Sequence, residues 1–457
     1  MAKYQKYAEY KDSGVDWLEV IPSHWTSIAI KFLALDKNSL FLDGDWIESK
    51  DISDSGIRYI TTGNVGTGFY KEQGSGFITE STFKKLSCSE VYAGDILISR
   101  LNLPIGRACI VPDLKNRIVT SVDNVIFRPD EEYHPKFLVY LFSSKEYFQN
   151  TENIARGATM QRISRGLLGN IRVVMPSKDE QTQIANFLDH ETAKIDHLIE
   201  KQQQLIELLK EKRQAVISHA VTKGLDPNVP MKDSGVEWLG EVPEHWNVTC
   251  LARISGIKRG SGYQNIEMEV EGQDTIQMLR IADMHEIAPA LIVKNTEVIR
   301  YLVEEGDILV AGTGATAGIS MLVPKECNGW VHSYNSIKVK VDSKKVNSAF
   351  LQLFLISDYI KKSLDVSFVG SAQPFVDTNG LGRLRVLLPP LHEQINIYDY
   401  LNIKTRKIDL LISKAQSAIQ LMQERRTALI SATVTGKIDV RNWQSPTVAE
   451  THTELSA

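Results

Sequence analysis

The feature that most constrains the fold of this chain is a long internal repeat. Residues 11–25 read KDSGVDWLEVIPSHW and residues 232–246 read KDSGVEWLGEVPEHW, which are identical at ten of fifteen positions. A second pair, residues 180–226 and 393–439, is identical at 22 of 47 positions without a gap. Agreement over such lengths does not arise by chance, so we expect two copies of one structural unit.

The segments between these matched pairs resemble each other only at scattered positions. Residues 94–97 and 306–309 both read Gly-Asp-Ile-Leu, and IRVVMP at 171–176 corresponds to LRVLLP at 384–389. Shortly before these, GATMQ at 157–161 corresponds to GSAQ at 370–373. This distribution indicates two copies of one fold whose exposed surfaces differ.

Apolar residues recur every seven positions in both copies of the second matched pair. The stripe residues are Leu188, Ile195, Leu209 and Val216 in the first copy and Leu401, Ile408, Met422 and Leu429 in the second, and Gln202 and Ala415 occupy the middle heptad position of each copy. We expect further apolar residues to widen it: Ile184, Leu198, Ile199, Leu205, Ile206 and Ala220 in the first copy, and Leu411, Ile412, Ala418 and Ile419 in the second. Five such heptads predict coiled-coil helices of about 44 residues, roughly 65 Å long.

Helix-boundary signals frame both predicted helices. Pro176 and Pro389 precede the two starts, and Gly224 and Gly436 lie at the two ends. Because each helix follows its own globular block and the chain must return, antiparallel pairing of the two helices is the simplest arrangement. The alternative is that each stripe packs on the core of its own domain.

The remaining blocks have the pattern of mixed α/β domains. Strand-like runs at 95–99, 108–111, 125–127 and 171–174 alternate with Gly- and Pro-marked turns, while 137–148 and 350–362 are predicted to be helical. We therefore predict an α/β (α+β) fold, in which two long antiparallel coiled-coil helices join two domains in a pseudo-twofold tandem repeat. The predicted segments are an N-terminal motif segment at 1–25, a first variable domain at 26–175, a helical spacer at 176–226, a linker with the repeated motif at 227–246, a second variable domain at 247–388, a second helical spacer at 389–436 and a C-terminal tail at 437–457.

Charge and cysteine content narrow the function classes. The 457 residues carry a formal net charge of -4. A protein that grips DNA alone usually has a basic face, so this balance argues mildly against a free-standing DNA binder but allows a grip shared with partners. Four scattered cysteines without a Cys-x-x-Cys pair favour free thiols over a zinc site. Without a leader-like start or a long apolar run, the chain is expected to be cytoplasmic and to have no membrane partner.

No familiar catalytic constellation is found in the sequence. The Asn/Asp-Pro-Pro-Tyr tetrapeptide of amino-methyltransferases, the Walker lysine and a His-Glu-x-x-His motif are all missing. The glycine-rich segment 312–318 is predicted to connect strands, and His24 and His245 are predicted to be packing residues. We therefore expect no catalytic centre and no metal site. A single-chain methyltransferase or nuclease, and a coiled-coil scaffold that binds protein, are the competing hypotheses.

Several motifs together carry a family resemblance. Lys-Asp-Ser-Gly-Val-(Asp/Glu)-Trp-Leu opens each half, Leu-Pro-Pro-Leu-His-Glu-Gln stands at 388–394, and Val-Thr-Gly-Lys-Ile-Asp-Val-Arg stands at 434–441. In combination they resemble the specificity subunits of type I restriction-modification systems, the HsdS family, over about residues 10–441. The first helix start departs from the pattern and reads Met-Pro-Ser-Lys-Asp-Glu-Gln at 175–181.

The resemblance implies a non-catalytic subunit of an adenine methyltransferase and endonuclease complex that defends against foreign DNA. Each variable domain would be a target-recognition domain that binds one half of a split double-stranded DNA sequence. The helices would act as a spacer and dock two modification subunits, which use S-adenosylmethionine. Two restriction subunits would add ATP- and Mg-dependent translocation and cleavage. This chain itself would bind no cofactor.

Reading of bases requires Arg, Lys, Asn or Gln side chains on short rigid loops, with basic groups beside them for phosphates. Gln161, Arg162 and Gln373 are the strongest candidates, because they occupy corresponding places in the two copies and differ in charge. The alternative for any one candidate is an ordinary solvated surface residue. The full set is Arg100, Arg107, Gln161, Arg162 and Arg165 in the first block and Lys258, Arg259, Tyr263, Gln264 and Gln373 in the second.

Overall fold

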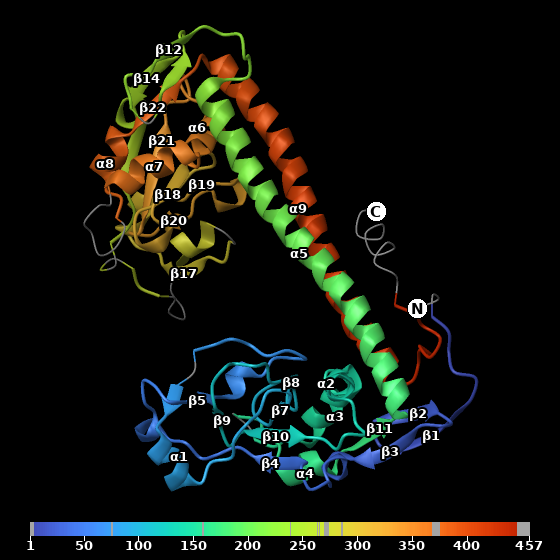
Figure 1. Ribbon diagram of the computed structural model, residues 1–457. Helices are drawn as coiled ribbons and strands as arrows, with labels where there is room; N and C mark the ends of the chain where they lie inside the picture. Colours follow the sequence, from blue (N-terminus) through green and yellow to red (C-terminus); the bar gives the residue numbers. More distant parts are fainter. Residues whose placement is uncertain are drawn as a thin grey trace. The chain divides into compact units, whose positions relative to one another are not determined.

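The computed structural model (Figure 1) describes residues 4–74, 76–157, 160–237, 239–262, 264, 266–268, 274–284, 287–367 and 375–445. The chain divides into two compact units. Unit 1 consists of Met1–Gln202 with Ser417–Ala457, and unit 2 consists of Gln203–Gln416. Each unit therefore contains one variable domain and a part of each long helix.

Unit 1 is built on a four-stranded antiparallel sheet of order β4-β10-β7-β8. A second sheet of order β6-β5-β9 is mixed, because β5 and β9 run parallel. Two antiparallel pairs, β1-β2 and β3-β11, complete the unit. The strands are Tyr10–Val15 (β1), Leu18–Pro22 (β2), Thr26–Ala29 (β3), Leu40–Asp43 (β4), Ile57–Ile60 (β5), Gly76–Ile78 (β6), Ile96–Ser99 (β7), Ala108–Ile110 (β8), Ile118–Thr120 (β9), Asn124–Arg128 (β10) and Arg172–Met175 (β11).

Unit 2 has the same set of sheets with the same strand order. Its four-stranded sheet is β15-β21-β18-β19, its mixed sheet is β17-β16-β20, and its pairs are β12-β13 and β14-β22. The predicted tandem repeat of mixed α/β domains is thus confirmed, also where the two sequences scarcely agree. The strands are Met231–Asp233 (β12), Glu241–Pro243 (β13), Asn247–Cys250 (β14), Ser255–Arg259 (β15), Thr275–Leu279 (β16), Ala290–Val293 (β17), Ile308–Ala311 (β18), Ser320–Leu322 (β19), Val331–His332 (β20), Ser336–Val341 (β21) and Arg385–Leu388 (β22).

The short helices correct one prediction. The helices expected over 137–148 and 350–362 are each two helices, because the chain turns between them. In unit 1 the hydroxyl of Ser144 accepts a hydrogen bond from the backbone N–H of Tyr147 and so caps a new helix. The short α-helices are Glu80–Leu86 (α1), Pro135–Leu141 (α2), Lys145–Ile154 (α3) and Arg165–Asn170 (α4) in unit 1, and Ser348–Leu355 (α6), Asp358–Ser367 (α7) and Thr378–Arg383 (α8) in unit 2.

The two long helices are Lys178–Lys223 (α5) and Leu391–Val434 (α9), and they pair in antiparallel fashion within each unit (Figure 1). Gly224 and Gly436 follow them with φ near +77° and +76°, the left-handed conformation that ends many helices. In unit 1, Arg426 Nε lies 2.9 Å from Asp196 Oδ1. In unit 2, Arg213 Nε lies 2.9 Å from Asp409 Oδ1. Within the described ranges, no helix is long and apolar enough to cross a bilayer.

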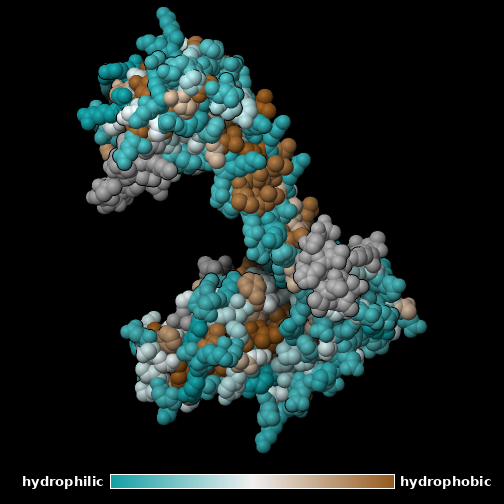
Figure 2. Space-filling view, turned by 45° about the horizontal axis from the view of Figure 1, so that its top comes forward, coloured by the Kyte–Doolittle hydropathy of each residue, from teal (hydrophilic) through white to brown (hydrophobic). Residues whose placement is uncertain are grey.

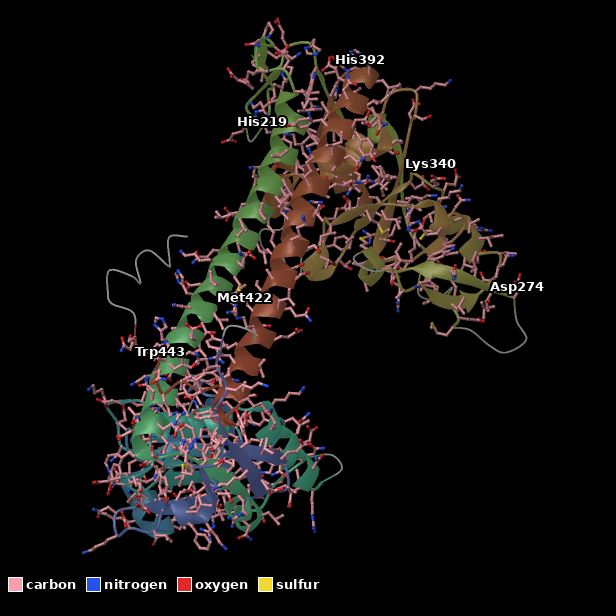
Figure 3. The ribbon with its side chains drawn as sticks, turned by 90° about the vertical axis from the view of Figure 1, so that its right-hand side faces the viewer. His219, Asp274, Lys340, His392, Met422 and Trp443 are labelled. Carbon is pink, nitrogen blue, oxygen red and sulfur yellow. The ribbon has the colours of Figure 1, made fainter. Side chains whose placement is uncertain are left out.

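The heptad stripe lies on the covered side of both helices. Figure 3 shows Met422 on α9, and Trp443 of the C-terminal segment beside α5, where its ring packs on Phe187. Leu188 and Ile195 also belong to the core of the unit 1 domain, so the alternative of packing on a helix's own domain holds for part of the stripe. Of the eight stripe residues, six are buried and Val216 and Met422 are partly buried; the buried ones are Leu188, Ile195, Leu209, Leu401, Ile408 and Leu429.

The expectation that Leu198, Leu205 and Leu411 widen this stripe is wrong. All three side chains are exposed. A seam between two helices covers about two residues in seven, and these leucines lie on its flanks.

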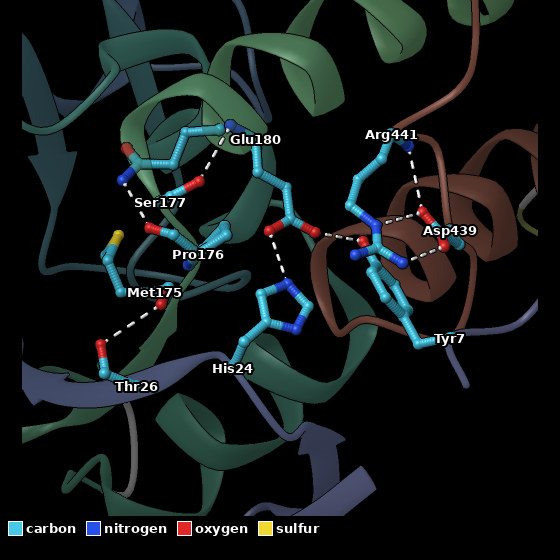
Figure 4. A network of polar contacts seen from close by, with 10 residues as sticks. Tyr7, His24, Thr26, Met175, Pro176, Ser177, Glu180, Asp439 and Arg441 are labelled. Carbon is cyan, nitrogen blue, oxygen red and sulfur yellow. Dashed lines mark hydrogen bonds and ion pairs between the residues drawn. The ribbon is translucent and has the colours of Figure 1, made fainter. Parts of the chain in front are cut away.

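The first turn of α5 is bonded to the repeated N-terminal motif (Figure 4). Glu180 Oε1 accepts a hydrogen bond of 2.6 Å from the Tyr7 hydroxyl, and its Oε2 lies 2.9 Å from His24 Nε2. The side chain of the adjacent Gln181 donates to the carbonyl of Pro176 and accepts from the backbone N–H of His134. One Glu-Gln pair therefore holds the motif, the helix and the domain together in unit 1.

Unit 2 repeats this arrangement with Glu393 and Gln394 of α9. The carboxylate of Glu393 lies 2.7 Å from His245 Nε2 and accepts a 2.9 Å hydrogen bond from Trp246 Nε1. Gln394 donates to the carbonyl of Pro389 and accepts from the backbone N–H of Asn347. The two motif histidines thus act as partners of a helix-start carboxylate.

One buried group gives unit 2 a specific pH dependence. His332 is buried, with its Nδ1 3.1 Å from the Ser336 hydroxyl, and burial with the charges of Lys338 and Lys258 lowers its pKa to about 3. An unfolded histidine titrates near 6.5, so the unfolded state takes up a proton first as the pH falls. The stability is therefore complete above about pH 6.5 and is lost progressively between 6.5 and 3.

We predict that lowering the pH from 8 to 5 costs unit 2 about 2 kcal/mol of unfolding free energy through this group. His332→Thr, which inserts the residue found at the matching position Thr120 of unit 1, should remove that pH slope even if it lowers stability at pH 8. The measurement is urea unfolding at both pH values, monitored by hydrogen exchange of the backbone amides of residues 331–341. His219→Thr, a change of an exposed histidine on α5, is the control and should keep the slope. An unchanged slope in His332→Thr would contradict the assignment.

Candidate nucleic-acid interface

Most of the sequence-predicted DNA-contacting residues of unit 1 meet at one end of its four-stranded sheet. β4 and β7 end there, and β8 and β10 begin there. The loop that follows β7 is joined to the segment that precedes α4, since Asn102 N–H donates to Gln161 O at 3.1 Å and Ile163 N–H donates to Arg100 O at 3.0 Å. Sequence-distant segments thereby form one loop cluster.

Arg100 lies beneath this loop cluster with only 4% of its surface exposed. Its guanidinium donates to the carbonyls of Ile163 and Val122 and lies 3.2 Å from Asp43 Oδ1. Burial lowers the pKa of Arg100, and the charge of Asp43 opposes that shift. The donors of this arginine are thus directed at the protein.

The donors of Arg107 are likewise bound to main-chain carbonyls of the protein. Its guanidinium donates to the carbonyls of Leu101, Asn102 and Pro104 in its own loop and to those of Thr62 and Val65 in a neighbouring loop. Burial lowers its pKa as well. Arg107 therefore ties two loops together at the sheet end.

Arg162 and Arg165 lie at the surface of the same loop cluster. The side chain of Arg162 is 44% exposed and its guanidinium lies 2.8 Å from Asp123, while the side chain of Arg165 is partly exposed and its guanidinium lies 3.6 Å from Asp43. An arginine has five N–H donors, so one carboxylate partner leaves others available to a ligand. Gln161 is partly buried between the loops.

In unit 2 the same end of the sheet carries aromatic rings. The guanidinium of Arg259, at the end of β15, lies 5.2 Å from the ring centre of Tyr334 and 4.9 Å from that of Phe375. Both rings are exposed at the surface. Loop 312–318 connects β18 to β19, as predicted.

The other unit 2 candidates lie apart from Arg259. Lys258 is exposed on β15, donates to Arg300 O at 2.9 Å and lies over the ring of Tyr301. Gln264 is exposed beyond the end of that strand. Tyr263 and Gln373 fall outside the described residues.

Sequence reasoning missed several exposed apolar groups at this end of the domains. Trp46, three residues after β4, is 66% exposed, and Leu103 and Met160 are exposed on the joined loops of unit 1. Tyr334 and Phe375 were missed in unit 2. No sequence signal separates an exposed aromatic residue from a core one.

The chemistry available here is hydrogen bonding, ion pairing and stacking. No group of three or more His, Cys, Asp or Glu side chains suited to a metal occurs within the described parts of the chain. Cys88 and Cys109 are buried, and burial raises the pKa of each to about 12, so both stay thiols at neutral pH. The loop clusters therefore have the properties of binding surfaces.

Comparisons with known proteins agree with these features. The profile of the type I restriction modification DNA specificity domain matches residues 40–208 and 243–420. Among curated relatives, the type I restriction enzyme MjaIX specificity subunit of Methanocaldococcus jannaschii is 22% identical, with 96% of this chain and 99% of the relative covered. The EcoBI specificity subunit of Escherichia coli is 24% identical, with 90% of this chain and 84% of the relative covered. The MjaVIII specificity subunit of M. jannaschii is 25% identical, with 67% of this chain and 71% of the relative covered.

Two solved structures show the same fold. A chain from a study of complex assembly and conformational transition in the type I R-M system has a TM-score of 0.69 and 15% identity, with 92% of this chain and 99% of that chain covered. The HsdS subunit of Thermoanaerobacter tengcongensis has a TM-score of 0.52 and 16% identity, with 92% and 98% covered.

Proposed function

Since this chain belongs to the type I restriction-modification DNA specificity family, we propose that it reads the DNA target of such a system, with each unit binding one half of a bipartite site. One observation carries the proposal: the same loop cluster recurs at the same sheet end of both units, but its exposed side chains differ. Arg162 of unit 1 bridges to Leu101, and at the matching bridge to Thr313 unit 2 has Phe375. A shared frame with different surfaces suits two different half-sites.

The exposed groups define how each half-site would be read. In unit 1, Arg162 and Arg165 can donate to guanine edges or phosphates, and Gln161 directly precedes Arg162. In unit 2, Tyr334 and Phe375 offer stacking or apolar contact, and Lys258 and Gln264 offer polar contact, together with Tyr263 and Gln373. Arg100 and Arg107 support the loops from below.

Catalysis is assigned to partner subunits. Adenine methylation requires the base to leave the stack and enter a pocket, which we place in a modification subunit with S-adenosylmethionine. ATP and Mg would serve restriction subunits. This chain contributes sequence reading and assembly, and its exposed loop residues supply hydrogen bonds rather than an acid–base pair.

The long helices offer a matched pair of docking surfaces for two modification subunits. Leu208 of α5 and Leu421 of α9 occupy equivalent positions in the repeat and are 62% and 64% exposed. Leu198 and Leu411 are likewise equivalent, and each is 50% exposed. Figure 2 shows hydrophobic surface along these helices. Leucines that are exposed to the same degree at repeated positions fit two copies of one partner.

The central test is reconstitution with the cognate modification subunit. The chain alone should transfer no methyl group, and the complex with S-adenosylmethionine should methylate adenines at one asymmetric, split sequence, mapped by single-molecule sequencing. Methyl transfer by the isolated chain, or methylation without sequence preference in its presence, would contradict the proposal. A protein-binding scaffold would give a complex without any DNA preference.

Arg162→Ala should weaken binding of the complex to DNA with an intact first half-site by about tenfold and relax the preference at one base pair, since a bidentate arginine–guanine contact is worth roughly 1–3 kcal/mol. Competition binding against a series of single-base variants gives both quantities. Arg117→Ala is the matched control, because its side chain is also 44% exposed but directly precedes β9 and pairs with Glu80 and Glu90, which do not belong to the loop cluster. Equal losses in both variants would show a general charge effect and not base reading.

Leu421→Glu should remove one modification subunit from the complex, and Leu208→Glu combined with it should remove both. Burial of a leucine contributes about 1.5–3 kcal/mol, so each charge should weaken one docking site by tenfold or more. Native mass spectrometry of the full complexes reports the stoichiometry. Leu35→Glu, at another exposed leucine that lies off the helices, should leave both subunits bound. If the double variant still binds two modification subunits, these leucines are not the docking surface.

A further inference from the structure

A guanidinium group occupies the same place in both loop clusters, although it comes from different strands. We infer that Arg100 in unit 1 and Arg259 in unit 2 are interchangeable positioning residues that brace the loop carrying the exposed residue at 162 or 375. The role in DNA reading rests on the function proposed above, whereas the brace itself is a property of the fold.

The register of the sheets identifies the equivalent positions. Arg100 N–H donates to Asp123 O, and Gly312 N–H donates to Asn335 O in the same way. The carbonyl of Arg100 accepts from Ile163 N–H, and that of Gly312 accepts from Val376 N–H. Gly312 therefore stands where unit 1 has Arg100, and Val376 stands where unit 1 has Ile163.

The strand on the opposite side shows the reverse exchange. Asp43 pairs with Val125 at the end of β4, and Arg259 pairs with Ile337 at the end of β15. The next residue is Gly44 or Gly260, whose N–H donates to Asn124 O or Ser336 O respectively. Arg259 therefore stands where unit 1 has Asp43.

The two guanidinium groups bind equivalent main-chain carbonyls. Arg100 donates to Ile163 O at 3.3 Å and to Val122 O. Arg259 donates to Val376 O at 2.7 Å and to Tyr334 O at 3.3 Å. Val122 and Tyr334 each precede the residue whose carbonyl accepts from position 100 or 312, so both acceptors match.

The space at Gly312 fits this exchange. A Cβ atom built on Gly312 would lie 3.0 Å from Nη1 of Arg259, so the arginine from β15 occupies the room in which a side chain at 312 would begin. In unit 1 the side chain of Arg100, at the position of Gly312, fills the corresponding space. Asp43, at the position of Arg259, supplies the countercharge for Arg100. Each unit thus has one guanidinium at this place, and the residue at the exchanged position, Asp43 or Gly312, leaves room or charge for it.

The brace acts directly beside the reading surface. The carbonyls of Ile163 and Val376 immediately follow Arg162 and Phe375, the exposed residues that differ between the units. A charge-assisted hydrogen bond to each carbonyl fixes the direction in which the preceding side chain points. Without it, only main-chain hydrogen bonds connect the loop to the sheet end, and we expect base discrimination to decline at that half-site alone.

The test is a transplant of the unit 1 arrangement into unit 2 of the full chain. Arg259→Asp alone should remove the brace, and Gly312→Arg alone should place two guanidinium groups in one space. Each should lower discrimination at the second half-site by about tenfold or more, given the strength of hydrogen bonds to charged groups. The double variant Arg259→Asp/Gly312→Arg should restore most of it. The first half-site is the internal control and should be read as in the unaltered protein.

A second measurement needs no DNA. Hydrogen exchange of the Val376 amide should accelerate in both single variants and return toward the original rate in the double variant. Arg259→Lys, whose single ammonium cannot span two carbonyls as a planar fork does, should give an intermediate rate. If the double variant exchanges and discriminates no better than Arg259→Asp, the inference is overturned. If hydrogen exchange of the Val376 amide changes as expected but neither the variants nor the original protein prefer any DNA sequence, the brace is supported and the proposed function is wrong.

Discussion

The Glu-Gln pair at the first turn of each long helix is the contact on which the rest of the architecture depends. Glu180 and Glu393 each lie within hydrogen-bond distance of a histidine of the repeated motif, and Gln181 and Gln394 accept from backbone N–H groups at the start of α2 or α6. A helix start has unpaired N–H groups and favours a carboxylate, so this pair both begins the helix and selects its neighbour. Gln181 is almost fully buried, and losing its side chain would remove the partner of one buried and one partly buried backbone group.

Much of the fold could be predicted because its repeated elements and long helices have recognisable sequence patterns. The repeated motif, the heptads and the bounding Pro and Gly residues predicted two matched halves and both long helices. The split at Ser144 was missed, because a serine inside an apolar run does not reveal that it will cap a new helix. The exposure of Leu198 and Leu411 was missed for another reason: a leucine on the flank of the helix seam gives nearly the same sequence pattern as one inside it.

The loop clusters were harder to predict, since their residues come together only in three dimensions. Arg100 and Arg107 are predicted as base-reading candidates on short loops, and the sequence does not show that main-chain carbonyls accept from their donors. The exchange between Arg100 and Arg259 was not visible either, because the two residues belong to different strands and align with Gly312 and Asp43. Composition identifies candidates for a polar surface, whereas burial decides which of them can reach a ligand.

The charges of the unit 1 loop cluster bear on how affinity and specificity would be divided in an assembled complex. Arg100, Arg162 and Arg165 lie near Asp43 and Asp123, so three positive charges meet two negative ones. The two carboxylates offset much of the attraction that the arginines exert on a phosphate, so we expect a correctly placed base edge to contribute most of the binding here. Non-specific binding depends on phosphate neutralisation, so a chain of net charge -4 should bind random DNA weakly. The phosphate grip is then best supplied by partner subunits, so that tight binding requires both a complete complex and the right sequence.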